Sequence, residues 1–333
     1  MRRRDEALEI SPTPTPSPVS KKMKLLTSYS TTSPFPEFEH PTPTEAREVH
    51  NLLTKSLNMQ PPTKGARRFE KNSATSCGNV QNVVDSLIGT ILSQNTSSRN
   101  SSNAKSSLDR KFGKHNFEAI ANAPLKDVVD SLRCGGLANK KGATIQKLLR
   151  SIKERHGDYS LQYLASTDSD GPGAKLTDDE IMQELISYDG VGPKTASCVL
   201  LFCLRRDSFA VDTHVYRLSK LLGWVPVKAD RVRAQAHLDK RIPDELKYGL
   251  HVMLIQHGRI CKGCKKDGSS GACVLKDYMA IGTSDGIPSL YSYLGEMSRT
   301  VTHLFSFLPN LAGSHLVTPV SRGAIRWFFD CPS

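Results

Sequence analysis

The sequence predicts an all-α protein, and three observations support that prediction. Apolar residues between 45 and 281 recur at the spacing of a buried helix face, as in 83–92, VVDSLIGTIL. No alternating strand pattern lasts long enough to compete. Glycines at 135–136, 157, 190–192 and 223 separate the helical patterns. The same spacing predicts further helices at 125–132, 145–152, 181–186, 196–204, 215–222 and 250–255.

Residues 1–44 are expected to form a disordered tail rich in Ser, Thr and Pro. The run at 11–18, SPTPTPSP, has too little apolar surface to offset the entropy of ordering it. Basic clusters at 2–4 and 21–24 flank this run and match a two-part nuclear address, although a solvated basic tail is the alternative. We expect a nuclear protein. Acidic residues between 5 and 9 disfavour a mitochondrial transit peptide, and co-localisation in mitochondria stays open.

The C-terminal segment, 282–333, differs in character from the helical unit at 45–281. It holds seven of the 22 aromatic residues, few charges and no clear period. A small appendage, a disordered tail and an artefact of a mispredicted reading frame are all compatible with it.

The net charge of +12 points to a polyanionic partner, with nucleic acid first among them. Residues 81–281 carry 30 basic and 22 acidic side chains, whereas 282–333 are neutral overall. No apolar run reaches the roughly 18 residues that a membrane span needs. Eight cysteines are too sparse for a disulfide scaffold and, without an apolar leader, favour reduced thiols inside the cell.

A helical hairpin is predicted around Gly190, Val191 and Gly192. Thr177-Asp-Asp-Glu180 has the pattern of a capping box that starts the first helix, and Pro193 suits the first position of the second. Two glycines around one apolar residue permit a tight turn with positive φ. Free amides at such a turn can bind a phosphate of any nucleotide sequence. A packed helical corner without DNA contact is the alternative.

Lys194 and Asp212 are the candidate catalytic residues. Lys194 lies in the first turn of the second helix, where the helix dipole disfavours an ammonium; a neutral amine is a nucleophile that can form a Schiff base. Asp212 follows 18 residues later and could activate that amine and stabilise a developing cation. Its alternative role is the N-cap of the next helix.

The motifs Gly190-Val-Gly-Pro-Lys-Thr-Ala196 and Val211-Asp-Thr-His214 together resemble the helix-hairpin-helix (HhH-GPD) DNA glycosylase superfamily, in its endonuclease III-like branch. The resemblance covers about 80–281. It implies a two-lobed fold, with one lobe at 80–206 that contains the hairpin at 188–194. The second lobe would combine 45–79 with 207–281.

The resemblance also implies an activity, in which Lys194 attacks the sugar C1′ and Asp212 assists loss of the base. The protein would be a base-excision repair glycosylase with AP-lyase activity on damaged bases, expected to be oxidised pyrimidines. Its partner would be double-stranded DNA with a damaged base or abasic site, bound by a monomer. Two alternatives remain: a monofunctional (mismatch) glycosylase, and a non-catalytic helix-hairpin-helix DNA-binding protein.

Two loops resemble DNA-contacting loops of this family. Gln94 or Asn95 would fill the gap left by the flipped nucleotide. Leu137 would wedge into the duplex, and Lys140 or Lys141 would contact phosphate. A polar helix end and a glycine C-cap with solvated lysines are the alternative interpretations.

Cys261, Cys264 and Cys273 occupy the region where endonuclease III-like enzymes carry a [4Fe-4S] cluster. Such a cluster needs four thiolates, and the family spacing Cys-x6-Cys-x2-Cys-x5-Cys would place two ligands at Ser270 and Met279. We therefore expect the cluster to be lost and no cofactor to be bound. Three thiols with His257 would make a Cys3His zinc set, which stays an open alternative. His214, His251 and His257 are otherwise expected to be packed or capping residues.

Overall fold

The structure, a computed structural model, describes residues 32–60, 69, 71–72, 78–167, 175–265 and 271–282. Within these ranges every regular element is helical, which confirms the all-α prediction. None of the described helices is both long enough and apolar enough to span a membrane. Both predicted basic clusters of the N-terminal tail lie outside the described residues, as does all but the beginning of 282–333.

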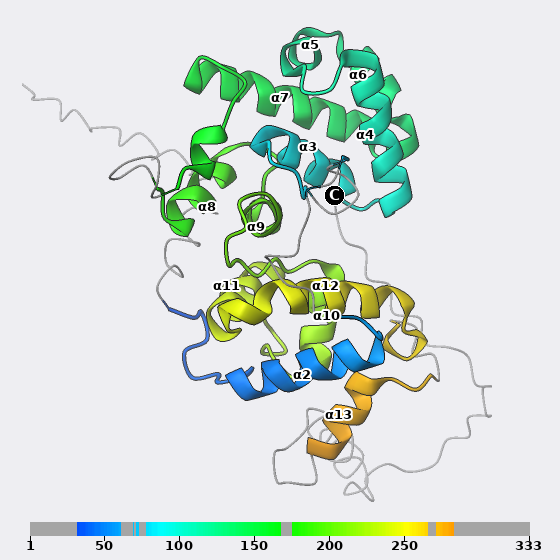
Figure 1. Cartoon of the computed structure of the whole chain (residues 1–333), viewed down its shortest axis with the longest axis vertical. Coiled ribbons are helices and arrows are strands. Elements are labelled where there is room, and N and C mark those ends of the chain that lie inside the picture. Colours follow the sequence, from blue (N-terminus) through cyan, green and yellow to red (C-terminus); the bar gives the residue numbers. More distant parts are fainter. Residues whose placement is uncertain are drawn as a thin grey trace, which may run out of the picture. The chain divides into compact units, whose positions relative to one another are not determined.

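The described helices belong to one unit that extends to residue 285 (Figure 1). In chain order they are α2 (Pro43–Ser56), α3 (Val83–Ser93), α4 (Ser98–Phe112), α5 (Phe117–Asn122), α6 (Leu125–Leu132), η1 (Arg133–Gly135), α7 (Ala138–His156), η2 (Gln162–Ala165), α8 (Asp178–Ser187), α9 (Pro193–Cys198), η4 (Val199–Cys203), α10 (Thr213–Leu221), α11 (Arg231–Arg241), α12 (Asp244–Ile260), η5 (Lys262–Cys264) and α13 (Val274–Gly282).

The first hydrophobic core is built around α3. Every residue from Val83 to Leu92 is buried, because α3 packs against α4, α7, α9 and η4 on different sides. A helix that is buried on all faces belongs in the interior of a bundle, and the buried Asp85 of α3 is paired with the Lys105 ammonium over 2.9 Å. The buried side chains of this core come from between Val83 and Cys203.

The second core combines distant segments of the chain. Ala46, Val49 and Leu53 of α2 pack with side chains from the region between Phe209 and Leu275. Helix α2 contacts α12 and α13, as Figure 1 shows for the blue, yellow and orange helices. Apolar burial therefore brings α2, the first helix of the described residues, back onto the C-terminal half of the unit.

A small third cluster joins the two cores. Cys198, Leu201 and Phe202 pack on Ala210 and on the side chains of α12. The segment from Val199 to Cys203 is a π-helical turn, in which the Leu204 amide donates to the Val199 carbonyl over 3.0 Å. Such turns insert one residue into a helix and are frequent beside functional sites.

The predicted end of the disordered tail at residue 44 is too late. Ser33 Oγ bonds to Nδ1 of His237 over 2.6 Å, and Phe35 and Phe38 both contact the imidazole ring of His237. Two aromatic residues supply enough apolar surface to order this proline-containing segment against α11. The ordered chain therefore begins before α2.

Candidate active site

Lys194 and Asp212 line the same cleft, which has a volume of about 480 Å³. Its walls come from both cores: the α3–α4 loop and α9 on one side, and α10, α11 and α12 on the other. The lining residues are Ser93, Gln94, Asn95, Thr96, Ser98, Ser101, Lys194, Thr195, Asp212, Thr213, His214, Arg231, Ile255 and Arg259. The structure thus brings together both candidate catalytic residues and both candidates for the gap-filling residue.

The hairpin presents Lys194 in the first turn of α9. The predicted capping box of α8 is confirmed, since Thr177 and Glu180 bond reciprocally, and Pro193 opens α9 as predicted. Val191 is buried and anchors the turn to the first core. Gly190 has φ +81°, and a Cβ there would collide with Cγ2 of Thr144. The turn therefore needs glycine for its backbone and for its close approach to α7.

Asp212 is the N-cap of α10, which was the alternative role considered for it. Its Oδ1 accepts a hydrogen bond of 2.8 Å from the Val215 amide. Its other oxygen, Oδ2, makes no hydrogen bond or ion pair with the part of the chain that the structure describes. The cap fixes the carboxyl group in the cleft wall and leaves one oxygen for chemistry.

The cleft also contains cations and hydroxyls that the sequence analysis did not single out. Arg231 and Arg259 supply two guanidinium groups. His214, expected to be a packed or capping residue, lines the cleft instead. It fits against α12 because position 258 is glycine: a Cβ there would lie 2.9 Å from Nδ1 of His214. Neither arginine belongs to a motif that predicts a place in the cleft: Arg259 follows His257 and Gly258 in the sequence, and Arg231 lies at the start of α11.

The α3–α4 loop gives its two candidate residues different positions. Gln94 donates from Nε2 to Thr195 Oγ1 over 3.1 Å, so it ties the loop to the residue after Lys194. Asn95 is exposed and has φ +49°, a left-handed conformation that Asn tolerates better than most residues. Asn95 is therefore the more exposed of the two candidates.

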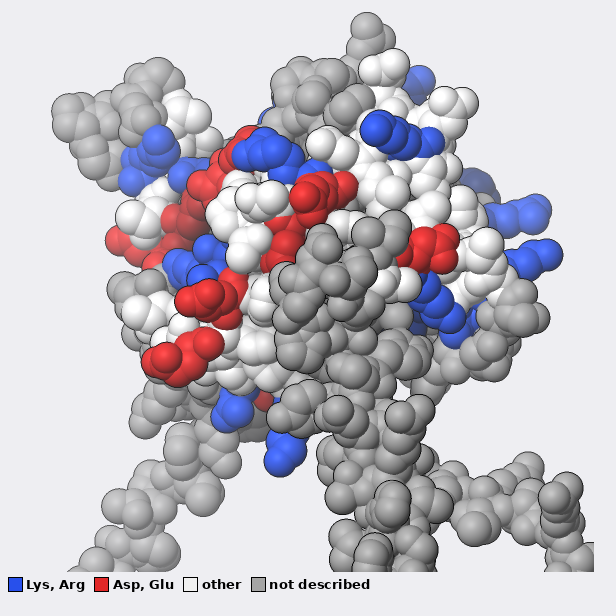
Figure 2. Space-filling model, turned by 90° about the horizontal axis from the view of Figure 1, so that it is seen from below, with Lys and Arg blue, Asp and Glu red and all other residues white. Residues whose placement is uncertain are grey.

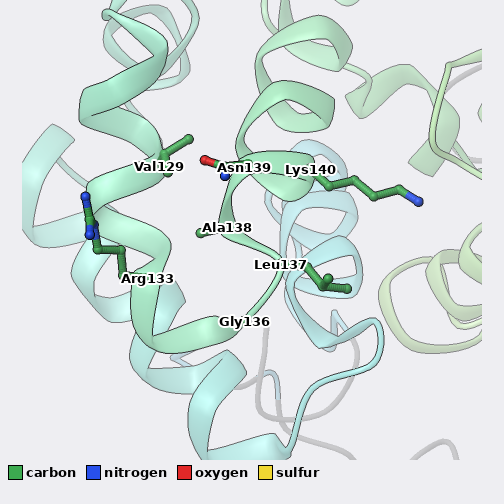
Figure 3. Close-up of a pocket in the computed structure, with 7 residues that line it drawn as sticks. All are labelled: Val129, Arg133, Gly136, Leu137, Ala138, Asn139 and Lys140. Carbon is green, nitrogen blue, oxygen red and sulfur yellow. The ribbon is translucent and has the colours of Figure 1, made fainter.

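Leu137 lies outside this cleft, in a hollow between α6 and α7 (Figure 3). Leu137 is 54% exposed and its backbone has φ +52°. An exposed Leu in a left-handed conformation is rare, and such strain concentrates at functional sites. Figure 3 shows the Leu137 and Lys140 side chains extending on the same side, away from Arg133. Lys140 is exposed and accessible to a ligand.

Lys141 does not occupy the position predicted for a phosphate contact. It is buried, and its ammonium donates to the Leu92 carbonyl over 2.8 Å, to the Gly135 carbonyl over 3.0 Å and to Thr96 Oγ1. These oxygens belong to the end of α3, the η1 turn and the α3–α4 loop. Lys141 therefore joins the two predicted DNA-contacting loops from inside, and of the two lysines only Lys140 is exposed.

A second cluster of chemically active side chains lies beyond α12. His257, Cys261, Cys264 and Cys273 place one ligand atom each within 4.8 Å of all the others, an arrangement that could hold a metal ion. His257 thus belongs to a ligand cluster and is not merely packed. Three thiols do not meet the four-thiolate requirement of a [4Fe-4S] cluster. These residues therefore do not fit the cluster that the family resemblance implies.

The face in Figure 2 carries acidic and basic side chains next to one another and offers no surface of a single sign. That face does not account for the affinity for a polyanion that the net charge suggests.

The sequence is similar to those of known DNA repair proteins. The sequence model of the HhH-GPD superfamily of base excision DNA repair proteins matches residues 88–244. A DNA glycosylase predicted in Arabidopsis thaliana is 38% identical over 251 residues, which are 71% of this chain and 82% of that protein. Endonuclease III of Sulfolobus acidocaldarius is 29% identical over 203 residues, which are 61% of this chain and 83% of that enzyme.

Solved structures share the fold. A non-covalent endonuclease III–DNA complex matches 72% of this chain and 99% of that enzyme, with a TM-score of 0.51 and 22% identity. A trapped covalent endonuclease III–DNA intermediate matches 69% of this chain and 91% of that enzyme, with the same TM-score and 23% identity. The predicted helix-hairpin-helix glycosylase fold is confirmed.

Proposed function

Because the chain belongs to the HhH-GPD superfamily of base excision DNA repair glycosylases, we propose that it removes a damaged base and then cleaves the strand as an AP lyase. The observation that carries the lyase half of the proposal is the presence of a lysine, Lys194, in the same cleft as Asp212. A lysine amine is a nucleophile that can remain attached to the sugar as a Schiff base. The relative from Sulfolobus acidocaldarius is named an endonuclease, which supports strand cleavage.

The proposed reaction begins with proton transfer from the Lys194 ammonium to the Asp212 carboxylate, directly or through water. The Nζ–C1′ bond then forms as the bond from C1′ to the base breaks, and the base leaves with the bonding electrons and takes up a proton. Opening of the sugar ring gives an iminium between Nζ and C1′. Loss of a C2′ proton breaks the C3′–O bond by β-elimination, and water releases Lys194. The departing base takes its proton from Asp212, and the carboxylate so regenerated stabilises the positive charge on the sugar.

Duplex DNA would lie across the mouth of the cleft. In this arrangement Gly190 and Gly192 face a phosphate, Asn95 occupies the gap left by the flipped nucleotide, and Leu137 separates base pairs. Arg231 and Arg259 would attract the phosphates that flank the flipped nucleotide. The proposal includes an oxidised pyrimidine as the damaged base and a monomer acting in the nucleus.

A panel of duplexes, each with one defined lesion, tests the proposal under single-turnover conditions. Base release and strand nicking are measured separately on each duplex. We expect both from the wild type on an oxidised pyrimidine, nicking to be lost in Lys194→Gln, and base release to fall at least 100-fold in Asp212→Asn, since positioned acid–base groups contribute about that much. Lys228→Gln, at an exposed surface lysine, is the matched control and should retain both.

Two outcomes would replace the proposal with its alternatives. Base release without nicking by the wild type would make the protein a monofunctional glycosylase, in which Lys194 only contacts DNA. Duplex binding with neither reaction on any lesion, unchanged in Asp212→Asn, would make it a non-catalytic DNA-binding protein.

A further inference from the structure

We propose that His257, Cys261, Cys264 and Cys273 bind a single zinc ion in tetrahedral coordination, in place of an iron–sulfur cluster. The inference is independent of the proposed glycosylase reaction, because none of these residues lines the catalytic cleft. Cys3His is an established structural zinc set. The region contains no other ligand of this kind, since residues 266–270, between Cys264 and Cys273, include neither Cys nor His.

The distances between the ligand atoms match one small ion. Zn–S bonds of about 2.3 Å and a Zn–N bond of about 2.0–2.1 Å place S and N about 3.6 Å apart in a tetrahedron. His257 Nε2 lies 3.3 Å from Cys264 Sγ and 3.6 Å from Cys273 Sγ. All four ligand atoms lie within 4.8 Å of one another.

The one contact that must lengthen is Cys264 Sγ to Cys273 Sγ, which is 2.8 Å. Around zinc this distance becomes about 3.8 Å, from bonds of about 2.3 Å at the tetrahedral angle. The observed separation exceeds the roughly 2.05 Å of a disulfide. The distance between the two sulfur atoms is thus intermediate between that of a disulfide bond and that of two ligands on one zinc ion.

An iron–sulfur cubane does not fit the same four atoms. Each of its four thiolates binds a different iron, so the ligand sulfurs stand around a whole cluster. Here the ligand atoms enclose the space of one ion, and one of the four is an imidazole nitrogen. The other described cysteines cannot complete a cluster, because Cys134 is exposed on the η1 turn and Cys198 and Cys203 are buried around α9 and η4.

The backbone around the site is shaped for close approach of the ligands. His257 and Cys261 are four residues apart at the end of α12, and residues at this spacing share one face of a helix. Gly263 has no room for a side chain: a Cβ there would lie 2.9 Å from Cys273 Cβ and would collide with the Gly271 carbonyl oxygen. Glycine therefore lets the η5 turn lie against the segment that carries Cys273.

Charge around the cluster also suits a zinc site. Three thiolates and Zn²⁺ leave a net charge of −1 among mostly buried ligands, which requires a compensating cation. The Arg217 guanidinium, on α10, donates to the Gly258 carbonyl over 3.2 Å, one residue from His257. Lys262 and Lys265 lie next to ligand cysteines in the sequence.

The metal would connect α12 to α13 and, through it, to α2. Cys273 immediately precedes α13, and α13 packs on α2. The same end of α12 contributes Ile255 and Arg259 to the catalytic cleft. Zinc would therefore hold one cleft wall in place without taking part in the chemistry.

Metal analysis of the full-length protein tests the proposal. The protein is purified without chelators from cells grown with iron and zinc, and its metals are counted by mass spectrometry. We expect one zinc per chain. Cobalt substitution should give the visible bands of tetrahedral Co²⁺ with thiolate charge-transfer absorption. Cys264→Ser and Cys273→Ser should bind zinc at least tenfold more weakly, whereas Cys134→Ser, at an exposed cysteine elsewhere, should bind as the wild type does.

Three results would overturn the proposal. About four irons per chain with visible absorption would show a cluster. A Cys264–Cys273 disulfide, found by peptide mapping without reductant, would show a redox pair. Wild-type protein that stays folded, with all thiols reduced, and takes up neither zinc nor cobalt would show that the cluster holds no metal; this result needs no variant and does not depend on whether the variants fold.

Discussion

Replacing Leu137 by glycine should weaken DNA binding without destabilising the protein. A left-handed conformation costs an L-residue about 1–2 kcal/mol, and glycine adopts it freely. Leu137 has φ +52° and is 54% exposed, so the substitution relieves strain and removes few contacts. Greater freedom of glycine in the unfolded chain offsets about 0.4–1 kcal/mol of this gain. The free energy of unfolding should therefore stay within about 1 kcal/mol of the wild type.

The loss of DNA affinity follows from the exposed part of the side chain. Complete burial of a Leu side chain is worth about 1.5–3 kcal/mol. Insertion into the duplex would bury the 54% that is exposed in the free protein, which is worth about 1–1.5 kcal/mol. Affinity should fall about fivefold to tenfold, since about 1.4 kcal/mol is a factor of ten.

Fluorescence anisotropy with a duplex that carries an uncleavable abasic-site analogue measures this affinity, and chemical denaturation measures stability. Val227→Ala is the control, because Val227 is 59% exposed and belongs to neither predicted DNA loop. Unchanged affinity in Leu137→Gly would refute the role of Leu137 in DNA binding. A loss of more than about 2 kcal/mol of stability would refute the strain argument, because relief of strain predicts almost none.

Three further predictions concern residues that hold the site in place. Lys141→Met should destabilise the protein by about 2 kcal/mol in chemical denaturation, because it removes the ammonium that donates to the buried Leu92 carbonyl, to the Gly135 carbonyl and to the Thr96 hydroxyl, whereas Lys140→Met should change stability by less than about 0.5 kcal/mol. Gly190→Ala should lower stability by about 1–3 kcal/mol through the collision with Thr144, and Thr144→Ser should recover part of the loss. Burial lowers the pKa of His237, whose Nε2 donates to the His40 carbonyl. The unfolded chain therefore binds more protons than the folded protein, and the melting temperature should fall as the pH drops from 7 to 5. In His237→Gln the melting temperature should fall less steeply over the same pH range.

The helical core was predictable because burial imposes a regular spacing on apolar residues. Val83 to Leu92 follow that spacing closely and form α3. Helix α4 was not predicted, since its sequence, SRNSSNAKSSLDRKF, is dominated by polar residues and buries only one side. Its start depends on a serine cap, in which Ser97 Oγ accepts from the Asn100 amide over 3.2 Å. A single cap before a polar helix is too weak a signal to recognise without the fold.

The spacing of buried residues in α7 predicts that Lys141 is buried and Lys140 is exposed. Lys141 lies four residues before Ile145, on the face of α7 that also buries Leu148 and Leu149. Extending the apolar pattern back by one turn would have placed Lys141 inside and Lys140 outside. The oxygens that the Lys141 ammonium bonds could not be predicted, because they come from α3, its following loop and η1.

For the metal-ligand cluster, the sequence pattern did not predict which residues the fold brings together. Comparison of cysteine spacing with a four-cysteine pattern predicted that the [4Fe-4S] cluster is lost, because the pattern is incomplete, and left a Cys3His zinc set as an open alternative. The fold gathers His257 with the three thiols, whose ligand atoms lie within 4.8 Å of one another, and sequence spacing alone could not show this closeness. Arg231 likewise enters the cleft only through the packing of α11, which no local motif in its sequence indicates.

The most direct test of the central claim is reduction of the enzyme–DNA intermediate with borohydride, followed by peptide mapping of the cross-link. An oxidised-pyrimidine duplex is the substrate, and an abasic duplex is the second substrate. The proposed mechanism predicts a covalent adduct on both, attached at Lys194, and no adduct at that position in Lys194→Gln. Efficient strand cleavage by the wild type with the adduct at another residue, or with none, would contradict it.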